Sequence, residues 1–476
     1  MRGLMAMLLA VVLAVPGAVR AAETPVVGEP AKSCTCAAAF DRAVAILEAD
    51  YAGFPIKVDG ERREAYDAFK AILRADAAGA GPDRCKEVLD TYTGFFQDHH
   101  VFVLRGGKPA GPERKAVRAW TEPQARAEIE RHRERLDPVE GLWYSRGGRL
   151  AVLREEGGPA GTFFAVRLAA DGSPSSDLAA VLRRDARGRY QIARRDAEGR
   201  WQTGEATLHR GGSLLVSGPE GWGRLLPEVK EARLDPADPQ APVFTRLDDG
   251  ILYLSLPSFS GEYRQPLNDI VTARGEDLAK AQGLVIDVRG NGGGDAIYFG
   301  LAEYLLTGPI KLSEDSLIVA SEGNLRNVEQ LRERIGEHGK VYDPAIARMR
   351  ENPGKLVPFL ESWSEGPAAV SPGPRRVAIL TDRGVGSAAE ALVLQLRQSP
   401  RVIVVGENTK GNIDYPQVYL SSVGCGDQAY LLGVPLYAGS RDLPAGGFDG
   451  SGIAPDVPVS DSRTDPLAFA VRLLRG

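Results

Sequence analysis

Two apolar runs, each followed closely by a glycine-rich turn, constrain this chain most strongly. Residues 283–288 (GLVIDV) and 376–381 (RVAILT) lack polar alternation, which is typical of strands buried on both faces of a sheet. Further strands are expected at 250–256 and 402–405. Helical patterns lie between them at 265–281, 296–306 and 387–397. This alternation predicts a layered α/β fold with largely parallel strands over residues 240–476.

The rest of the chain follows other patterns. Apolar residues recur at helical spacing in 23–136, which predicts a helical N-terminal domain. Short apolar stretches alternate with glycine turns in 137–230, which predicts a small antiparallel β domain, a barrel or a curled sheet. A charged helical insertion is expected at 322–364. The chain is thus predicted to be a multidomain α/β protein.

Aromatic and histidine side chains of the β domain are read as structural. Trp143, Trp201 and Trp222 are expected to fill its core, and the sequence gives His209 no function.

Composition excludes several classes of protein. The 476 residues carry 58 Lys and Arg against 63 Asp and Glu, so no basic excess points to a nucleic-acid partner. Hydrophobic residues make up 43% of the chain, as in an ordinary globular protein rather than a disordered one.

The first 22 residues have the pattern of a secretory signal peptide. Arg2 precedes an apolar run from Leu4 to Val15, and small residues follow at Val19 and Ala21. The run is too short for a membrane span, which needs about 20 residues. A periplasmic or secreted protein without a membrane span is therefore expected.

Four cysteines follow this segment. An oxidising compartment would allow disulfides, and we expect one bridge from Cys34 or Cys36 to Cys85. The full connectivity, including Cys425, stays open.

The first glycine-rich segment is residues 287–294 (DVRGNGGG). Its glycines allow backbone amides to converge on one point. It lacks the Lys-Ser/Thr of a phosphate-binding loop and the spacing of a dinucleotide fingerprint. An oxyanion hole, in which preorganised amides face a developing alkoxide, explains it better.

The second segment is residues 384–390 (GVGSAAE). Here Ser387 opens a helix, where the helix N-terminus favours a transient negative charge. Taken alone, an ordinary capping box of Ser387 and Glu390 explains this pattern equally simply.

Together, the two segments resemble the carboxy-terminal-processing and tricorn-type serine peptidases of family S41. The segments VVGENT at 404–409 and GIAPD at 452–456 extend the resemblance, which covers about half the chain. It implies a crotonase-like αββ core, Ser387 as nucleophile, and an oxyanion hole formed by the amide of Ala388 with that of Gly292 or Gly293. It requires no metal or organic cofactor.

The resemblance does not decide which residue activates Ser387, because two branches of the family use different bases. The tricorn-like branch uses a His in an Asp-x-His-Thr pattern, which His100 matches, with Val101 in place of Thr. The processing branch uses a Lys, whose ungapped counterpart here is Asn412, while Lys410 lies two residues earlier. We expect His100 to be the base, with a Ser387/Lys410 dyad as the alternative.

Asp449 lies where tricorn-like relatives carry a Glu, and is expected to orient His100. Glu390 is expected to hold the serine turn, and Asp287 and Arg289 to brace the strand end. No PDZ-like loop precedes the core. The sequence thus predicts an exported serine peptidase acting on peptides or unfolded proteins, with a homo-oligomer left open. A non-catalytic peptide-binding scaffold of the same fold is the other alternative.

Overall fold

A computed structural model describes residues 26–27, 34–105, 117–196, 199, 201–229, 233–247, 250–426, 429–460 and 464–475. The predicted signal peptide, residues 1–22, lies outside this part of the chain. None of the helices within it is long and apolar enough to cross a bilayer.

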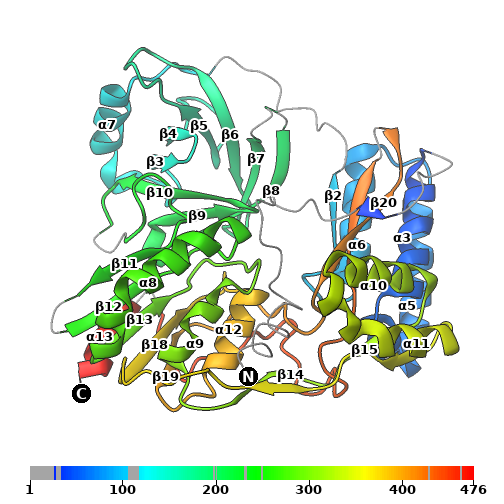
Figure 1. Ribbon diagram of the computed structural model, residues 1–476. Coiled ribbons are helices and arrows are strands. Elements are labelled where there is room, and N and C mark those ends of the chain that lie inside the picture. Colours follow the sequence, from blue (N-terminus) through cyan, green and yellow to red (C-terminus); the bar gives the residue numbers. More distant parts are fainter. Residues whose placement is uncertain are drawn as a thin grey trace.

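A six-stranded sheet forms the centre of the C-terminal half (Figure 1). Its strands, in spatial order, are β11 (Val243–Arg246), β12 (Ile251–Ser255), β13 (Gly283–Asp287), β18 (Arg376–Thr381), β19 (Val402–Gly406) and β22 (Val457–Pro458). All neighbours pair in parallel except β11, which is antiparallel to β12. The parallel strands place the ends of β13 and β18, and therefore both glycine-rich segments, at one edge.

Helices cover both faces of this sheet. One face packs against α8 (Arg264–Lys280), η5 (Ile297–Leu301), α9 (Ala302–Leu305) and α12 (Ala388–Leu396), with η4 (Gly261–Tyr263) leading into α8. The other face packs against α13 (Pro466–Arg475). The buried strands are apolar throughout because side chains of both faces enter a core.

A closed barrel of eight strands stands on this sheet (Figure 1). Its strands are β3 (Gly141–Ser145), β4 (Gly148–Leu153), β5 (Thr162–Arg167), β6 (Asp177–Arg184), β7 (Tyr190–Arg195), β8 (Trp201–His209), β9 (Leu214–Ser217) and β10 (Glu220–Leu226), with the turn η2 (Arg210–Gly212) after β8. Trp143 and Trp222 are buried in its core, as expected. Trp201 is not: it is half-buried, with the guanidinium of Arg195 over its ring.

The segment expected to be one helical domain divides between two cores. Helix α7 (Glu122–Arg131) and the turn η1 (Arg133–Arg135) lie against the barrel, where Ala125 and Ile129 pack with Leu142. The helices before it pack elsewhere. They are α3 (Cys36–Asp50), α4 (Gly53–Lys57), α5 (Gly60–Asp76) and α6 (Pro82–Gly94).

These N-terminal helices share one core with the insertion, so the two form a single lobe, here called the helical lobe (Figure 1). The insertion contributes α10 (Glu322–Arg334), η6 (Gly336–Tyr342) and α11 (Asp343–Glu351). A sheet in the order β1 (Val26–Val27), β20 (Val418–Val423), β21 (Tyr430–Pro435) and β2 (Phe102–Arg105) completes the lobe. Two small antiparallel pairs join β14 (Ile310–Ser313) to β17 (Trp363–Glu365) and β15 (Leu317–Val319) to β16 (Leu356–Pro358).

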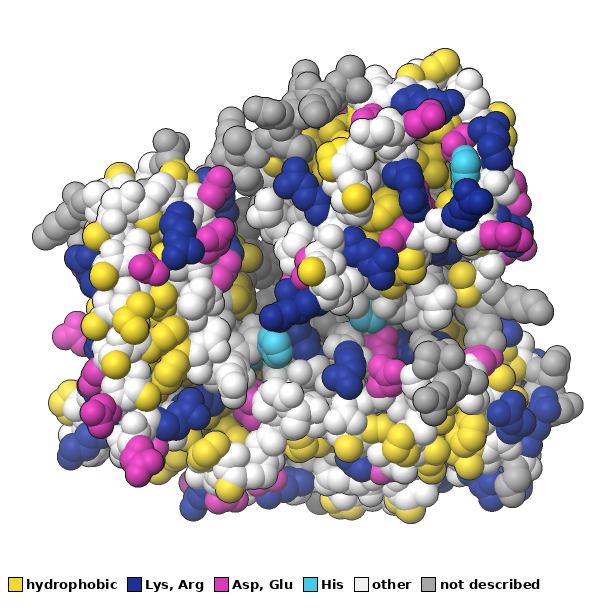
Figure 2. Space-filling model, turned by 180° about the vertical axis from the view of Figure 1, so that it is seen from behind, with side chains coloured by type: hydrophobic (Ala, Val, Ile, Leu, Met, Phe, Trp, Pro, Cys, Tyr) yellow, Lys and Arg dark blue, Asp and Glu magenta, His cyan; other side chains and the backbone are white. Residues whose placement is uncertain are grey.

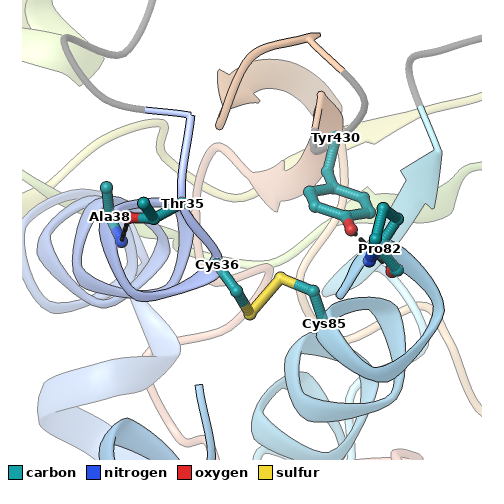
Figure 3. Close-up of a disulfide and its surroundings, with 6 residues drawn as sticks. All are labelled: Thr35, Cys36, Ala38, Pro82, Cys85 and Tyr430. Atoms are coloured by element: carbon teal, nitrogen blue, oxygen red, sulfur yellow. Dashed lines mark hydrogen bonds between the residues drawn. A yellow bond between two sulfur atoms is a disulfide. The ribbon is translucent and has the colours of Figure 1, made fainter. Parts of the chain in front are cut away.

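Two disulfides tie the helical lobe together. Cys36 bonds to Cys85, which links α3 to α6 and confirms the expected bridge (Figure 3). Cys34 bonds to Cys425, a partner 391 residues away, which the sequence did not indicate. Both bridges therefore connect the start of α3 to segments that come together only in the folded chain.

Candidate active site

Ser387 lies on a sharp turn between a buried strand and a helix. β18 ends at Thr381 and α12 begins at Ala388. Ser387 has a φ of +52°, a conformation that costs a non-glycine residue about 1–3 kcal/mol and is concentrated at functional sites. The turn leaves the serine half-buried at the helix N-terminus, where negative charge is favoured.

Glu390 holds this turn, as the sequence predicted. Its carboxylate accepts hydrogen bonds from the amide of Ser387 (3.0 Å) and from the amides of Gly411 (2.7 Å) and Asn412 (2.9 Å). The hydroxyl of Thr409 donates to it at 2.5 Å. Glu390 is fully buried, so these donors replace the water that its charge has lost. Glu390 therefore links the serine turn to the 409–412 loop through hydrogen bonds.

The glycine-rich segment after β13 lies directly against the serine turn. A β-carbon added to Gly293 would lie 2.7 Å from Cβ of Ser387 and 3.0 Å from the nitrogen of Ala388. Only a glycine allows this approach. Asn291 fixes it, because its backbone carbonyl accepts the Gly386 amide (3.0 Å) and its side-chain amide donates to the carbonyl of Leu256 (2.9 Å).

The three predicted oxyanion donors are not equivalent. The Gly293 amide already donates to Oδ1 of Asn291 at 2.9 Å. In the part of the chain that the structure describes, the amides of Gly292 and Ala388 donate to no protein acceptor. Of the two glycines left open by the sequence, Gly292 is therefore the better partner for Ala388.

The strand end beneath these loops is braced by charge. Asp287 is fully buried and accepts from the guanidinium of Arg289 (2.8 Å) and the hydroxyl of Tyr253 (2.8 Å). Burial alone would raise the pKa of Asp287, but Arg210 and Arg289 lower it far below its ordinary value. This confirms the bracing role expected for Asp287 and Arg289.

His100 is held from two sides. Its amide donates to Oδ1 of Asp98 (2.8 Å), and its Nδ1 lies 2.8 Å from the carbonyl oxygen of Tyr415. The other oxygen of Asp98 accepts from Tyr51 (2.8 Å). A carbonyl can only accept, so Nδ1 carries the proton and Nε2 of the neutral ring has a free lone pair.

His100 and Ser387 are brought to the same loop. Asn412 accepts the Ser387 amide through Oδ1 (2.7 Å), and Tyr415 binds His100 three residues later. Burial lowers the pKa of His100, as does the charge of Lys410, which favours the neutral ring that a base requires. Within the described residues, no direct hydrogen bond joins the Ser387 hydroxyl to His100.

Asp449 does not orient His100, in contrast to the sequence-based expectation. Its Oδ2 lies 2.6 Å from Nζ of Lys57, which also donates to the carbonyl of Phe96 (2.9 Å). Burial and the charge of Asp98 raise the pKa of Asp449 to about 7, although Lys57 lowers it. Lys57, 392 residues away, occupies Oδ2, and the buried Oδ1 has no hydrogen-bond partner among the described residues.

Lys410 and Asn412, the two positions considered for a lysine base, have different environments. The side chain of Asn412 is already bonded to the Ser387 amide. Lys410 is exposed, but the surrounding protein displaces enough water to lower the pKa of its ammonium group. The charges of Glu390 and Glu205 act in the opposite direction. Glu205 lies on β8, so the barrel wall faces this site.

Sequence reasoning missed three residues beside the site: His209, Arg210 and Asp382. His209 was judged to be without function, yet its Nδ1 lies 2.8 Å from Oδ2 of Asp382, two residues before the Gly384 turn. All three are buried. Sequence gave only one signal, a polar His-Arg pair at the end of a strand.

The site lies where the three parts of the molecule meet. Figure 2 shows a hollow between the helical lobe, the barrel and the central sheet, lined by histidine, basic and acidic side chains. Among the described residues, no group of three or more His, Cys, Asp or Glu side chains is arranged to hold a metal ion. The arrangement instead combines a strained serine, a buried neutral histidine and free backbone amides, the components of acyl transfer.

Comparisons with known proteins agree with this class. Residues 250–459 match the model of peptidase family S41. This segment, somewhat less than half of the chain, is thus similar to peptidase family S41. No curated protein sequence matches it.

Solved structures resemble the fold over nearly the whole chain. Mature CPAF complexed with lactacystin is 13% identical, with a TM-score of 0.50, over 93% of this chain and 98% of that one. The photosystem II D1 C-terminal processing protease is 15% identical, with a TM-score of 0.36, over 93% and 98%. The tricorn protease is 11% identical, with a TM-score of 0.39, over 93% of this chain and 37% of that one.

Proposed function

We propose that this chain is an exported serine peptidase that hydrolyses peptide bonds through an acyl-enzyme on Ser387, with His100 as general base. The observation that carries the proposal is the Ser387 turn: a strained serine at a helix N-terminus, packed against Gly293 and beside two free amides. The proposal includes a crotonase-like αββ fold for the core.

Each group has a defined step. Oγ of Ser387 attacks the peptide carbonyl while Nε2 of His100 takes its proton. The amides of Ala388 and Gly292 donate hydrogen bonds to the negative oxygen that forms. The carbon–nitrogen bond then breaks, and His100 gives its proton to the leaving amine. Water, deprotonated by His100, attacks the ester and releases the acid and Ser387.

His100 must move closer to Ser387 for the first step, since no hydrogen bond joins them. Such bonds are often long without substrate and tighten in the complex. The Tyr415 carbonyl takes the place that a carboxylate has in the Ser-His-Asp arrangement, because it fixes the same tautomer. Asp98 supplies the nearby negative charge that favours the imidazolium formed during the reaction.

Export is supported by the two disulfides, which persist in oxidising compartments, and by the pattern of residues 1–22. The proposed substrates are peptides or unfolded proteins, which would bind in the hollow between the three parts (Figure 2).

The test is labelling of the mature protein with a fluorophosphonate probe, together with hydrolysis of fluorescein-labelled casein. Wild type should do both, and Ser387→Ala should do neither while keeping its melting temperature within a few degrees. Casein cleavage by Ser387→Ala at the wild-type rate would overturn the proposal. A folded wild type that binds peptide but neither labels nor cleaves would favour the binding scaffold.

A further inference from the structure

We infer that His209, a barrel residue, is a positioning residue for the active site, and that the barrel sets the distance between the oxyanion loop and the serine turn through it. The inference rests on the proposed function, because those two segments are the proposed catalytic ones. The oxyanion loop is residues 290–293, and the serine turn is residues 384–387.

One carboxylate joins His209 to both segments. Oδ2 of Asp382 accepts from Nδ1 of His209 (2.8 Å). Oδ1 accepts the amide of Gly290 (2.9 Å) and the amide of Gly384 (2.9 Å). Burial would raise the pKa of Asp382, but His209 and the two amides lower it below its ordinary value. The carboxylate is therefore ionised, so Nδ1 of His209 is the donor.

The imidazole also packs against both segments. A β-carbon on Gly290 would lie 3.0 Å from Cγ of His209, and one on Gly384 would lie 2.2 Å from its Cε1. A β-carbon on Gly384 would also lie 2.9 Å from Cα of Gly290, so the ring packs against both glycines where their backbones approach each other. Gly290 leads to Gly292 in two residues, and Gly384 leads to Ser387 in three. A shift of the ring would change the separation of the amides from the serine.

Arg210 anchors the same end of the barrel. Its guanidinium is buried and donates to the carbonyls of Arg289 (3.1 Å) and Asp287 (3.0 Å) and to Oγ of Ser255 (2.7 Å). Arg210 has a φ of +54°, a strained conformation for a residue with a side chain. The strained residue thus places its charged side chain at the ends of β12 and β13. These contacts connect the barrel to the central sheet independently of the His209 contact.

These contacts predict an effect on the chemical step. Oxyanion donors stabilise the transition state more than the bound substrate, so misplacing them lowers kcat with little change in KM. A general loss of barrel stability would not lower kcat selectively. The two effects can therefore be separated by variants of His209 and a matched variant of the barrel core.

The test compares His209→Asn with His209→Gln in the full mature protein. An asparagine amide can replace Nδ1 and donate to Asp382, whereas a glutamine amide is displaced by one methylene toward the position of Nε2. Val152→Ala, in the barrel core, is the control for stability. Casein hydrolysis gives kcat and KM, the fluorophosphonate labelling rate reports on the serine alone, and melting temperatures show which variants are folded at the assay temperature.

We expect His209→Gln to lose at least about tenfold in kcat and in labelling rate, with KM within about threefold, because removal of a single oxyanion donor costs about 100-fold or more. His209→Asn should keep most of the rate, and Val152→Ala should keep it despite a lower melting temperature. Equal rates for Asn and Gln, or an equal loss in Val152→Ala, would overturn the inference. If wild type neither labels nor cleaves, the proposed function fails instead.

Discussion

Nδ1 of His100 lies 2.8 Å from the carbonyl oxygen of Tyr415, and this single contact defines the chemistry available to the ring. It places the proton on Nδ1 and leaves Nε2 with a free lone pair, as the proposed base requires. The Tyr415 carbonyl orients the ring but carries no full negative charge, unlike the carboxylate of a Ser-His-Asp site. The charge comes instead from Asp98, whose oxygens are bonded to the His100 amide and to Tyr51.

Replacement of His100 by alanine should lower kcat for casein hydrolysis by about 10²–10⁴-fold, the usual contribution of a general base. His99→Ala is the matched control, because His99 is the exposed neighbour and makes no contact with Tyr415. Steady-state kinetics on both variants check this. Full activity of His100→Ala would remove His100 from the mechanism.

Replacement of Lys410 by methionine should move the acidic limb of the pH–rate profile to higher pH. The charge of Lys410 lowers the pKa of His100, so its removal raises that pKa, and the base becomes protonated at a higher pH than before. At alkaline pH the variant should approach the wild-type rate. Loss of activity at every pH would support the Ser387/Lys410 dyad instead.

Gly293→Ala should abolish labelling of Ser387, whereas Gly292→Ala should not. A β-carbon at Gly293 would collide with Ser387 and Ala388, and its φ of +103° is strained for alanine. Nothing lies within 4 Å of such a carbon at Gly292, and the alanine keeps its amide donor. Fluorophosphonate labelling of the two folded variants decides between them, and equal labelling would contradict the packing described.

Lys57→Met should destabilise the protein by about 3–5 kcal/mol at pH 8, the usual cost of removing one partner of a buried ion pair. The loss should be smaller at pH 5. With a pKa of about 7 against an ordinary 3.8, Asp449 is protonated in the fold at pH 5 and has no charge left unpaired. Melting temperatures at the two pH values measure this, and a second substitution, Asp449→Asn, should recover part of the loss at pH 8.

The unfolded mature protein should show no free thiol before reduction and four after it, since both disulfides use all four cysteines. Thiol titration in denaturant checks this. Two free thiols in protein purified under oxidising conditions would contradict one of the two bridges.

Local sequence was enough for the four inner strands of the central sheet, whereas the edge strands β11 and β22 were not predicted. β18 and β19 begin where the apolar runs predicted, and α12 begins one residue after Ser387, because a strand buried on both faces must be apolar and a helix start needs capping groups. The contact of Glu390 with the Ser387 amide and the Asp287–Arg289 pair also followed, since each joins residues within three positions along the chain. The bonds of Glu390 to the 409–412 loop did not.

The following contacts between distant segments could be identified only in the tertiary structure. Asp449 lies in a motif-like position, but Lys57 of α4 occupies its carboxylate, and no local pattern records a partner 392 residues away. Helix α7 was grouped with the other N-terminal helices, yet its apolar face packs on the barrel. Amphipathic spacing shows that a helix has a buried face without showing what covers it.

The sequence by itself determined the strands, the serine turn and the glycine-rich segment, because each depends on side-chain size, backbone freedom and capping within a few residues. Only the tertiary structure decided which groups meet there: Tyr415 on His100, Lys57 on Asp449, and His209 of the barrel on Asp382. Those meetings depend on how three hydrophobic cores pack against one another, and packing of that range leaves no periodic trace along the chain.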